Sequence, residues 1–157
     1  MDVDRPEFLR YQRARFTTQL PRTYLYSRSH FWIGGCDKDT WRVGLTKFGS
    51  RLLGEMVDYG FELTAGSALS SGQVIGWVEG FKGVADIASI SEGLFQCANP
   101  ALENDPTLVN QDPYGAGWLY SVRGKPDLSC VNVEGYAKIL DAIIDRLQAG
   151  AAAGFPV

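Results

Sequence analysis

The sequence predicts a mainly β fold, and three observations support this. Short runs rich in valine, isoleucine and aromatic residues recur through the middle of the chain, and glycines separate them at close intervals. Such runs are typical of strands in a β-sandwich or flattened barrel. Near the C-terminus the apolar spacing changes to that of an amphipathic helix. The length of 157 residues and an apolar content of 45% suit one domain with a sizeable core.

The first thirty residues are basic. They hold six arginines against three acids, a net charge of +3, and because the whole chain carries −3 the remainder carries −6. Residues 4–19 are expected to form a short basic helix that ends at Pro21. This arm either docks an acidic partner or packs back on the acidic body of its own chain, and we favour the second alternative.

Two strands and a short helix are expected next. Residues 24–33 are expected to be extended and to lead into the first strand, residues 34–37 (Gly-Gly-Cys-Asp) to form a turn, and residues 40–45 to form the second strand. A helix follows, with Thr46 as its N-cap and Gly54 just past its C-terminal end.

A series of short strands with glycine-rich turns follows the helix. Between residues 99 and 114 the chain is rich in Asn, Asp and Pro, which indicates turns and short helical segments. The expected strands are 55–61, a short one at Leu69, 73–79, 84–90, 94–98 and 118–122.

The tail is predicted to be an amphipathic helix of about four turns that packs on the sandwich. Asn132 is the expected N-cap and Gly150 the expected end. Its apolar face consists of Val133, Tyr136, Ile139, Leu140, Ile143, Ile144 and Leu147.

Lys82 is the residue with the clearest functional expectation. It lies in the turn Gly80-Phe81-Lys82-Gly83, between two runs that are rich in β-branched residues. A lysine at the tip of a hairpin has its amine in water on a rigid support, with no partner expected nearby. This placement suits the attachment of a tethered group, although turns also carry lysines that are merely solvated.

Several classes of function are excluded by what the chain lacks. The net charge of −3 argues against nucleic acid as a partner, and no stretch is apolar enough to span a membrane. His30, the one histidine, is expected to be structural, and no catalytic residue or metal site is predicted. Cys36, Cys97 and Cys130 form no metal or redox motif and indicate reduced thiols in a cytoplasm. The first residues contain acids and no apolar segment, which argues against a secretory signal.

From His30 to Leu119 the chain resembles the H protein of the glycine cleavage system, a lipoyl carrier. The most specific piece is residues 99–110, followed by Asp112-Pro-Tyr-Gly-Ala-Gly-Trp118. The other matching pieces are His30-Phe-Trp32, Val43-Gly-Leu-Thr46, Leu53-Gly-Glu55, Gly66, Gly72, Val78-Glu79, Lys82, Asp86 and Gly93.

The resemblance implies a mainly β lipoyl-carrier fold, a barrel-sandwich hybrid with short helices and a C-terminal helix. It implies a non-catalytic carrier with lipoate joined by an amide to Lys82. The implied partners are a lipoate ligase or a lipoyl or octanoyl transferase, and dihydrolipoamide dehydrogenase. The residues expected to be recognised by the modifying enzyme are Glu79, Gly80, Phe81, Gly83 and Asp86.

The same resemblance divides the chain into three parts. These are a basic extension over residues 1–29, a lipoyl-carrier sandwich over 30–123 and a C-terminal helical part over 124–157. Methionines usually flank the lysine of biotin carriers, whereas Phe81 and Gly83 flank Lys82, so lipoate is preferred to biotin.

The pathway is left open between two main alternatives. The arginine-rich extension and the residues around the lysine, including Trp77, Phe81 and Ile90, depart from the glycine-cleavage pattern. They are more similar to lipoate-binding proteins that work with heterodisulfide-reductase-like complexes in bacterial sulfur oxidation, which is the preferred expectation. The alternatives are carriage of the aminomethyl group among the glycine cleavage enzymes and a role as an unmodified interaction module.

Overall fold

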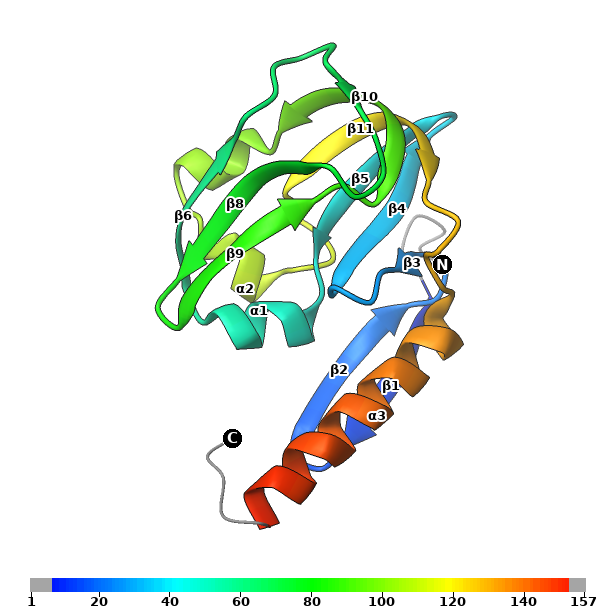
Figure 1. Ribbon diagram of the computed structural model, residues 1–157, viewed down its shortest axis with the longest axis vertical. Helices are drawn as coiled ribbons and strands as arrows, with labels where there is room; N and C mark the ends of the chain where they lie inside the picture. The colour runs from blue at the N-terminus through cyan, green and yellow to red at the C-terminus, as the bar shows by residue number, and fades with distance from the viewer. Residues whose placement is uncertain (1–6, 153–157) are drawn as a thin grey trace.

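The computed structural model describes residues 7–152, which form a β-rich body with a helical and hairpin unit projecting from one end (Figure 1). The strands are β1 (Phe8–Arg13), β2 (Phe16–Pro21), β3 (Leu25–Tyr26), β4 (Phe31–Asp37), β5 (Thr40–Leu45), β6 (Met56–Phe61), β7 (Ala68–Leu69), β8 (Val74–Gly80), β9 (Gly83–Ala88), β10 (Ser91–Ala98) and β11 (Tyr120–Pro126). The helices are α1 (Lys47–Leu53), the 3₁₀ turn η1 (Pro100–Glu103), α2 (Leu108–Gln111) and α3 (Val133–Ala152).

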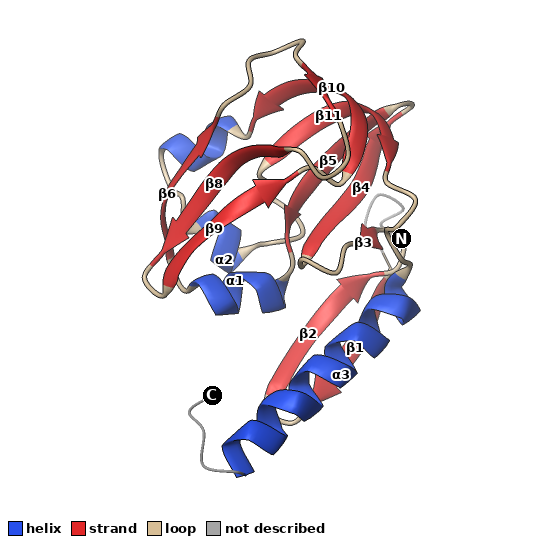
Figure 2. Cartoon of the chain, viewed as in Figure 1, coloured by secondary structure: helices blue, strands red, loops and turns tan. Residues whose placement is uncertain are grey.

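Two sheets make up the body. One has six strands in the order β3-β4-β5-β11-β10-β7, and the other has three in the order β6-β8-β9 (Figure 2). The strand pairs within both sheets are antiparallel. Their facing sides enclose the main core, which supplies most of the hydrophobic stabilisation. Its most deeply buried members include Ile33, Val43, Met56, Ile75, Val78, Ile87, Leu119, Tyr120 and Val122.

A second core lies where α3 meets the body. Strand β4 separates the two cores, because successive side chains on a strand point to opposite faces. Phe31 and Ile33 face the main core, whereas Trp32 between them faces the second. The other members of the second core are Tyr11, Phe16, Leu20, Tyr26, Phe48, Trp118, Val133, Tyr136, Leu140 and Ile144.

The expected basic helix over residues 4–19 is wrong: within its described part, the chain forms the hairpin β1–β2. The alternation of side chains decides the outcome, since Leu9, Tyr11, Phe16 and Leu20 fall on one face of the paired strands. That face is buried against α3, so the burial of one strand face outweighs the helical spacing that Leu9, Phe16 and Leu20 also have. The remaining residues of that predicted helix, 4–6, lie outside the described part.

The basic segment packs back on the acidic body, as the preferred alternative expected. The Arg13 guanidinium donates two hydrogen bonds of 2.8 Å to the Asp145 carboxylate of α3 and lies 3.3 Å from Asp141. Tyr11 donates a hydrogen bond of 2.8 Å to Asp141. These contacts are largely exposed, so they align the hairpin with the helix more than they stabilise it.

The predicted turn over residues 34–37 is also wrong, because these residues continue β4 and the turn comes afterwards at residues 38–39. A Cβ on Gly34 would lie 2.5 Å from the Tyr24 ring, so glycine is needed there for close packing and not for a turn. Gly150 does not end the last helix, which runs to Ala152.

The expected extended segment over residues 24–33 is wrong, because the chain turns back between β3 and β4 and these two strands pair antiparallel. The remaining elements match the expectations closely, apart from shifts of a few residues at strand ends. Thr46 caps α1, where its hydroxyl accepts a hydrogen bond of 3.1 Å from the Gly49 N–H. Gly54 follows the helix with a φ of 79°, a conformation that favours glycine. The C-terminal helix is amphipathic as predicted, with its apolar face on the β1–β2 hairpin and on β3.

The second core gives a test of the α3 packing. Leu140→Ala is expected to lower the free energy of unfolding by about 2–5 kcal/mol, because it leaves a cavity at a fully buried position. Leu147→Ala on the same helix is the matched control and is expected to cost less than about 1 kcal/mol, because that side chain is 38% exposed. Denaturant unfolding of both variants measures the difference, and equal losses would contradict the burial of Leu140.

Candidate functional site

Lys82 lies at the tip of the β8–β9 hairpin, as the sequence predicts. Gly80 pairs with Gly83, which leaves Phe81 and Lys82 as a two-residue turn beside α1 (Figure 1). Both turn side chains are exposed, and Phe81 retains 76% of its accessible surface. The fold therefore presents the lysine at a corner of the body on a short, regular support.

The hairpin tip is attached to the C-terminal end of α1. The Lys82 N–H donates to the Leu53 carbonyl at 3.0 Å, and the Phe81 N–H donates to the Glu55 carbonyl at 3.1 Å. The expectation that the amine has no partner is wrong, since Nζ of Lys82 donates to the Arg51 carbonyl at 3.1 Å. The last carbonyls of a helix carry partial negative charge and favour a cation there.

One of the two turn glycines is required by this attachment. A Cβ on Gly80 would lie 2.3 Å from the Leu53 carbonyl oxygen, so any side chain would push the tip away from α1. A Cβ on Gly83 would meet no heavy atom within 4 Å. Glycine is therefore required for steric reasons at position 80 but not at position 83.

Acidic side chains gather on the outer face of the β6-β8-β9 sheet. Glu79 lies opposite Val84, and Asp86 is two residues further along β9, so the three side chains share one face. Asp58 of β6 pairs directly with Glu79 and adds a third carboxylate. The sequence analysis missed Asp58, because its position depends on a strand pairing that sequence spacing does not reveal.

An apolar groove of about 410 Å³ begins at Lys82. It runs between α1 and the hairpin towards the start of β4. Exposed Leu52 and Val84 stand at its rim, and Asp86 and His30 contribute polar groups. A flexible chain attached to Lys82 therefore has an apolar surface within immediate reach.

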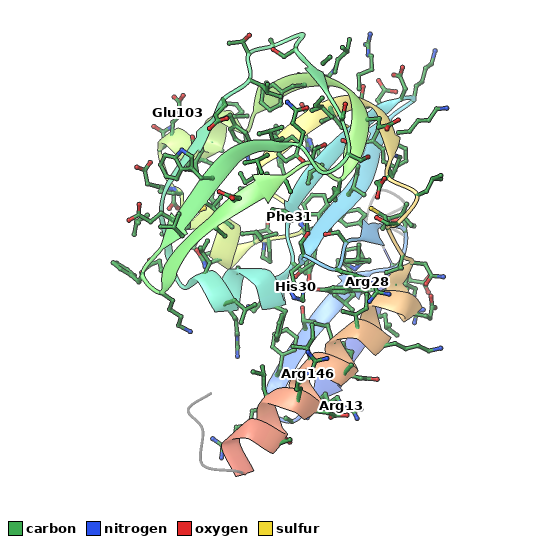
Figure 3. The ribbon with its side chains drawn as sticks, in the orientation of Figure 1. Arg13, Arg28, His30, Phe31, Glu103 and Arg146 are labelled. Carbon is green, nitrogen blue, oxygen red and sulfur yellow. The ribbon has the colours of Figure 1, made fainter. Side chains whose placement is uncertain are left out.

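His30 is held in place by the C-terminal helix, where the sandwich meets α3 (Figure 3). Its Nδ1 lies 2.9 Å from the Tyr136 hydroxyl, which in turn lies 2.7 Å from the hydroxyl of Thr46. Burial lowers the pKa of the His30 imidazole below its ordinary value of 6.5, so the ring is neutral at pH 7. These contacts agree with the structural role expected for His30.

The thiols and carboxylates show no sign of a metal centre. In residues 7–152, no three His, Cys, Asp or Glu side chains are placed to hold a metal ion. Cys36 and Cys97 are free and exposed, and burial raises the pKa of the half-buried Cys130 to about 11. Cys130 is therefore an inert thiol at neutral pH. No helix in the described part of the chain has the length and apolar character of a membrane span.

Comparisons with known proteins agree on one family. Residues 24–142 match the family model described as Glycine cleavage H-protein. The glycine cleavage system H protein of Corynebacterium jeikeium is 40% identical over 110 residues, which cover 68% of this chain and 85% of that protein. The Mycobacterium leprae protein of the same name is 40% identical over 105 residues, or 67% of this chain and 79% of that one.

The fold agrees with the same family. The crystal structure of a glycine cleavage system H protein from Mycobacterium marinum superposes with a TM-score of 0.68 at 33% sequence identity. The match covers 76% of this chain and 97% of that one. The predicted mainly β lipoyl-carrier fold is confirmed, and the β1–β2 hairpin lies outside the residues that match the family model.

The two turn glycines offer a matched pair of substitutions. Gly80→Ala is expected to destabilise the protein by about 1–3 kcal/mol, because the added methyl group overlaps the Leu53 carbonyl. Gly83→Ala is expected to stay within about 0.5 kcal/mol, since the position is open. Thermal or denaturant unfolding compares the variants, and equal stability of the two would contradict the close contact at Gly80.

The buried His30 predicts a pH dependence of stability. Because its pKa is lowered in the folded protein, the unfolded chain takes up a proton first as the pH falls. The free energy of unfolding should therefore drop as the pH falls below 6.5. Denaturant unfolding at several pH values should show a weaker dependence in His30→Asn, which tolerates the φ of 71° at this position. The same slope in both proteins would contradict the prediction.

Proposed function

Since this chain belongs to the glycine cleavage H-protein family, we propose that Lys82 is the residue that bears its lipoyl group. The family establishes that the chain is a carrier of covalently bound lipoate and not a catalyst. The carrier brings its partners a group at high local concentration, and the partner enzymes supply the chemistry.

The single observation that carries the assignment is the geometry of the hairpin tip. Lys82 combines an exposed side chain with a backbone that is hydrogen-bonded to the end of α1. An enzyme that acylates this amine meets a fixed backbone and an exposed side chain. The same rigidity aims the acylated lysine in a reproducible direction, which a swinging arm requires.

The surroundings of Lys82 fit a lipoyl group. When bound, lipoate supplies a two-electron disulfide/dithiol couple at the end of an apolar chain. The groove beside Lys82 offers Leu52 and Val84 as exposed apolar contacts, with Leu53 beneath them. We propose that these residues shelter the apolar chain between encounters, because the contact removes apolar surface from water.

We further propose that the hairpin residues named from the sequence guide the modifying enzyme. Glu79 and Asp86 present carboxylates on the outer face of the hairpin, and Phe81 offers a large exposed apolar contact. Gly80 acts indirectly by allowing the tip to lie on α1. Gly83 keeps the base of the turn free of a side chain.

The proposed pathway is glycine cleavage, with the carrier holding the aminomethyl group and meeting the glycine cleavage enzymes and a lipoate ligase or transferase. The sequence analysis preferred sulfur oxidation with a heterodisulfide-reductase-like complex. The named relatives and the solved structure are glycine cleavage H proteins and support the alternative instead. The departures around the lysine identify no cargo.

Lys82→Arg tests the attachment site. Incubation with a lipoate ligase, lipoate and ATP should add one lipoyl group to the wild-type protein and none to the variant, as measured by intact mass. The stability of the variant should change by less than about 0.5 kcal/mol, because the side chain is exposed. Lys125→Arg, at an exposed position on β11, is the matched control and should be modified normally. A lipoyl adduct on Lys82→Arg would falsify the assignment.

A further inference from the structure

A second groove lies beside Lys82, on the side of α1 that faces away from the apolar groove. It has a volume of about 560 Å³. Its charged lining consists of Lys47, Arg51 and Lys82 with the single carboxylate of Glu55. Thr107 and Asn110 add polar groups along its edge. A locally positive groove on a chain of net charge −3 is a feature that the lipoyl assignment does not explain.

Within the described residues, the cations of this groove have no acidic partner, and the Lys82 amine donates only to the Arg51 carbonyl. The salt bridges among residues 7–152 involve Arg13, Arg22 and Arg123, and none of the three groove cations. Arg51 is also positioned, because its guanidinium lies 5.5 Å from the centre of the Phe16 ring. Such cation–π contacts restrain an exposed arginine and leave its N–H donors available.

Phe16 belongs to the β1–β2 hairpin, outside the residues that match the family model. Its ring also packs edge-on against Phe48 of α1, with ring centres 5.4 Å apart. The extra hairpin thus supports the exposed side of α1 next to the attachment lysine. The hairpin therefore positions Arg51, whereas the three groove cations themselves lie within the residues that match the family model.

We propose that this groove docks an acidic segment of the enzyme that attaches lipoate to Lys82. The inference rests on the proposed function. Complementary charge at the rim of an interface steers encounter and selects partners. Phe81, which follows Gly80 and precedes Lys82 in the turn, adds an exposed apolar side chain next to these cations, a composition common in protein interfaces.

Acylation changes the charge of this groove. The Lys82 amine attacks the acyl carbon of a mixed acyl-phosphate anhydride, the new C–N bond replaces the C–O bond, and the phosphate leaves with the electron pair. The ammonium form of Lys82 loses two protons over the whole step, so the product is a neutral amide. The groove then holds two cations instead of three, and the acidic segment binds the product less tightly than the substrate.

The test uses two variants that lack the Lys82 amine as competitors of the wild-type acceptor protein. Lys82→Arg keeps the positive charge and Lys82→Gln removes it, so each is added as an inhibitor of wild-type modification by a lipoate ligase with lipoate and ATP. Lys82→Arg is expected to inhibit about fivefold more strongly at low salt, and the difference should shrink at about 0.5 M salt, where charges are screened. Equal inhibition by both variants at low salt would overturn the proposal.

Substitutions that reverse the charge of groove residues test whether the enzyme binds at this groove. Lys47→Glu/Arg51→Glu is expected to lower kcat/KM for acceptor protein about tenfold at low salt. Lys47→Glu alone leaves the Arg51–Phe16 contact in place and should lower kcat/KM by a smaller factor, which separates charge from folding. Lys38→Glu, in the β4–β5 turn far from the hairpin tip, is the matched control and should be modified at the wild-type rate (Figure 1).

The outcomes separate the two proposals. Normal modification of wild type with the same kcat/KM in Lys47→Glu/Arg51→Glu as in Lys38→Glu would overturn the docking groove and leave the lipoyl assignment standing. A wild-type protein that acquires no lipoyl group would remove the lipoyl assignment, and the docking groove with it.

Discussion

The attachment of the β8–β9 tip to the end of α1 is the constraint on which the site depends. The Leu53 carbonyl accepts the Lys82 N–H, and only a glycine at position 80 lets the two backbones approach so closely. Because a helix end offers unsatisfied carbonyls, it also provides an acceptor for the lysine amine at Arg51. A two-residue turn that would otherwise fray is thereby fixed relative to both sheets.

Helix α1 contacts both the C-terminal helix and the N-terminal hairpin. Thr46, its cap, lies within hydrogen-bond distance of Tyr136 on α3, and Phe48 packs against Phe16 of the N-terminal hairpin. The second core therefore does more than bury the last helix. It links segments far apart in the sequence to the short helix that holds Lys82, while β4 keeps the two cores separate.

The sequence predicts most of the fold and the central residue of the site, because strands, caps and a hairpin lysine leave local signatures. Thr46, Gly54 and Lys82 are examples. Contacts between segments that are distant in the sequence leave no local signature. Examples are Asp58 beside Glu79, the Arg51 carbonyl beside the Lys82 amine, and the Phe16 ring beside the Arg51 guanidinium. In the N-terminal segment, Leu9, Phe16 and Leu20 fit a helical spacing as well as one face of the β1–β2 hairpin, so spacing alone does not select the hairpin.

The pairing of the β1–β2 hairpin with α3 has a consequence for synthesis of the protein. Tyr11 and Asp141, which share a hydrogen bond, are separated by 130 positions. At typical rates of translation, the apolar face of the hairpin leaves the ribosome on the order of ten seconds before the helix that covers it. During that interval the β-rich body has time to form around its own core. The nascent chain meanwhile exposes the apolar face of the β1–β2 hairpin, which is therefore a segment where a chaperone would bind.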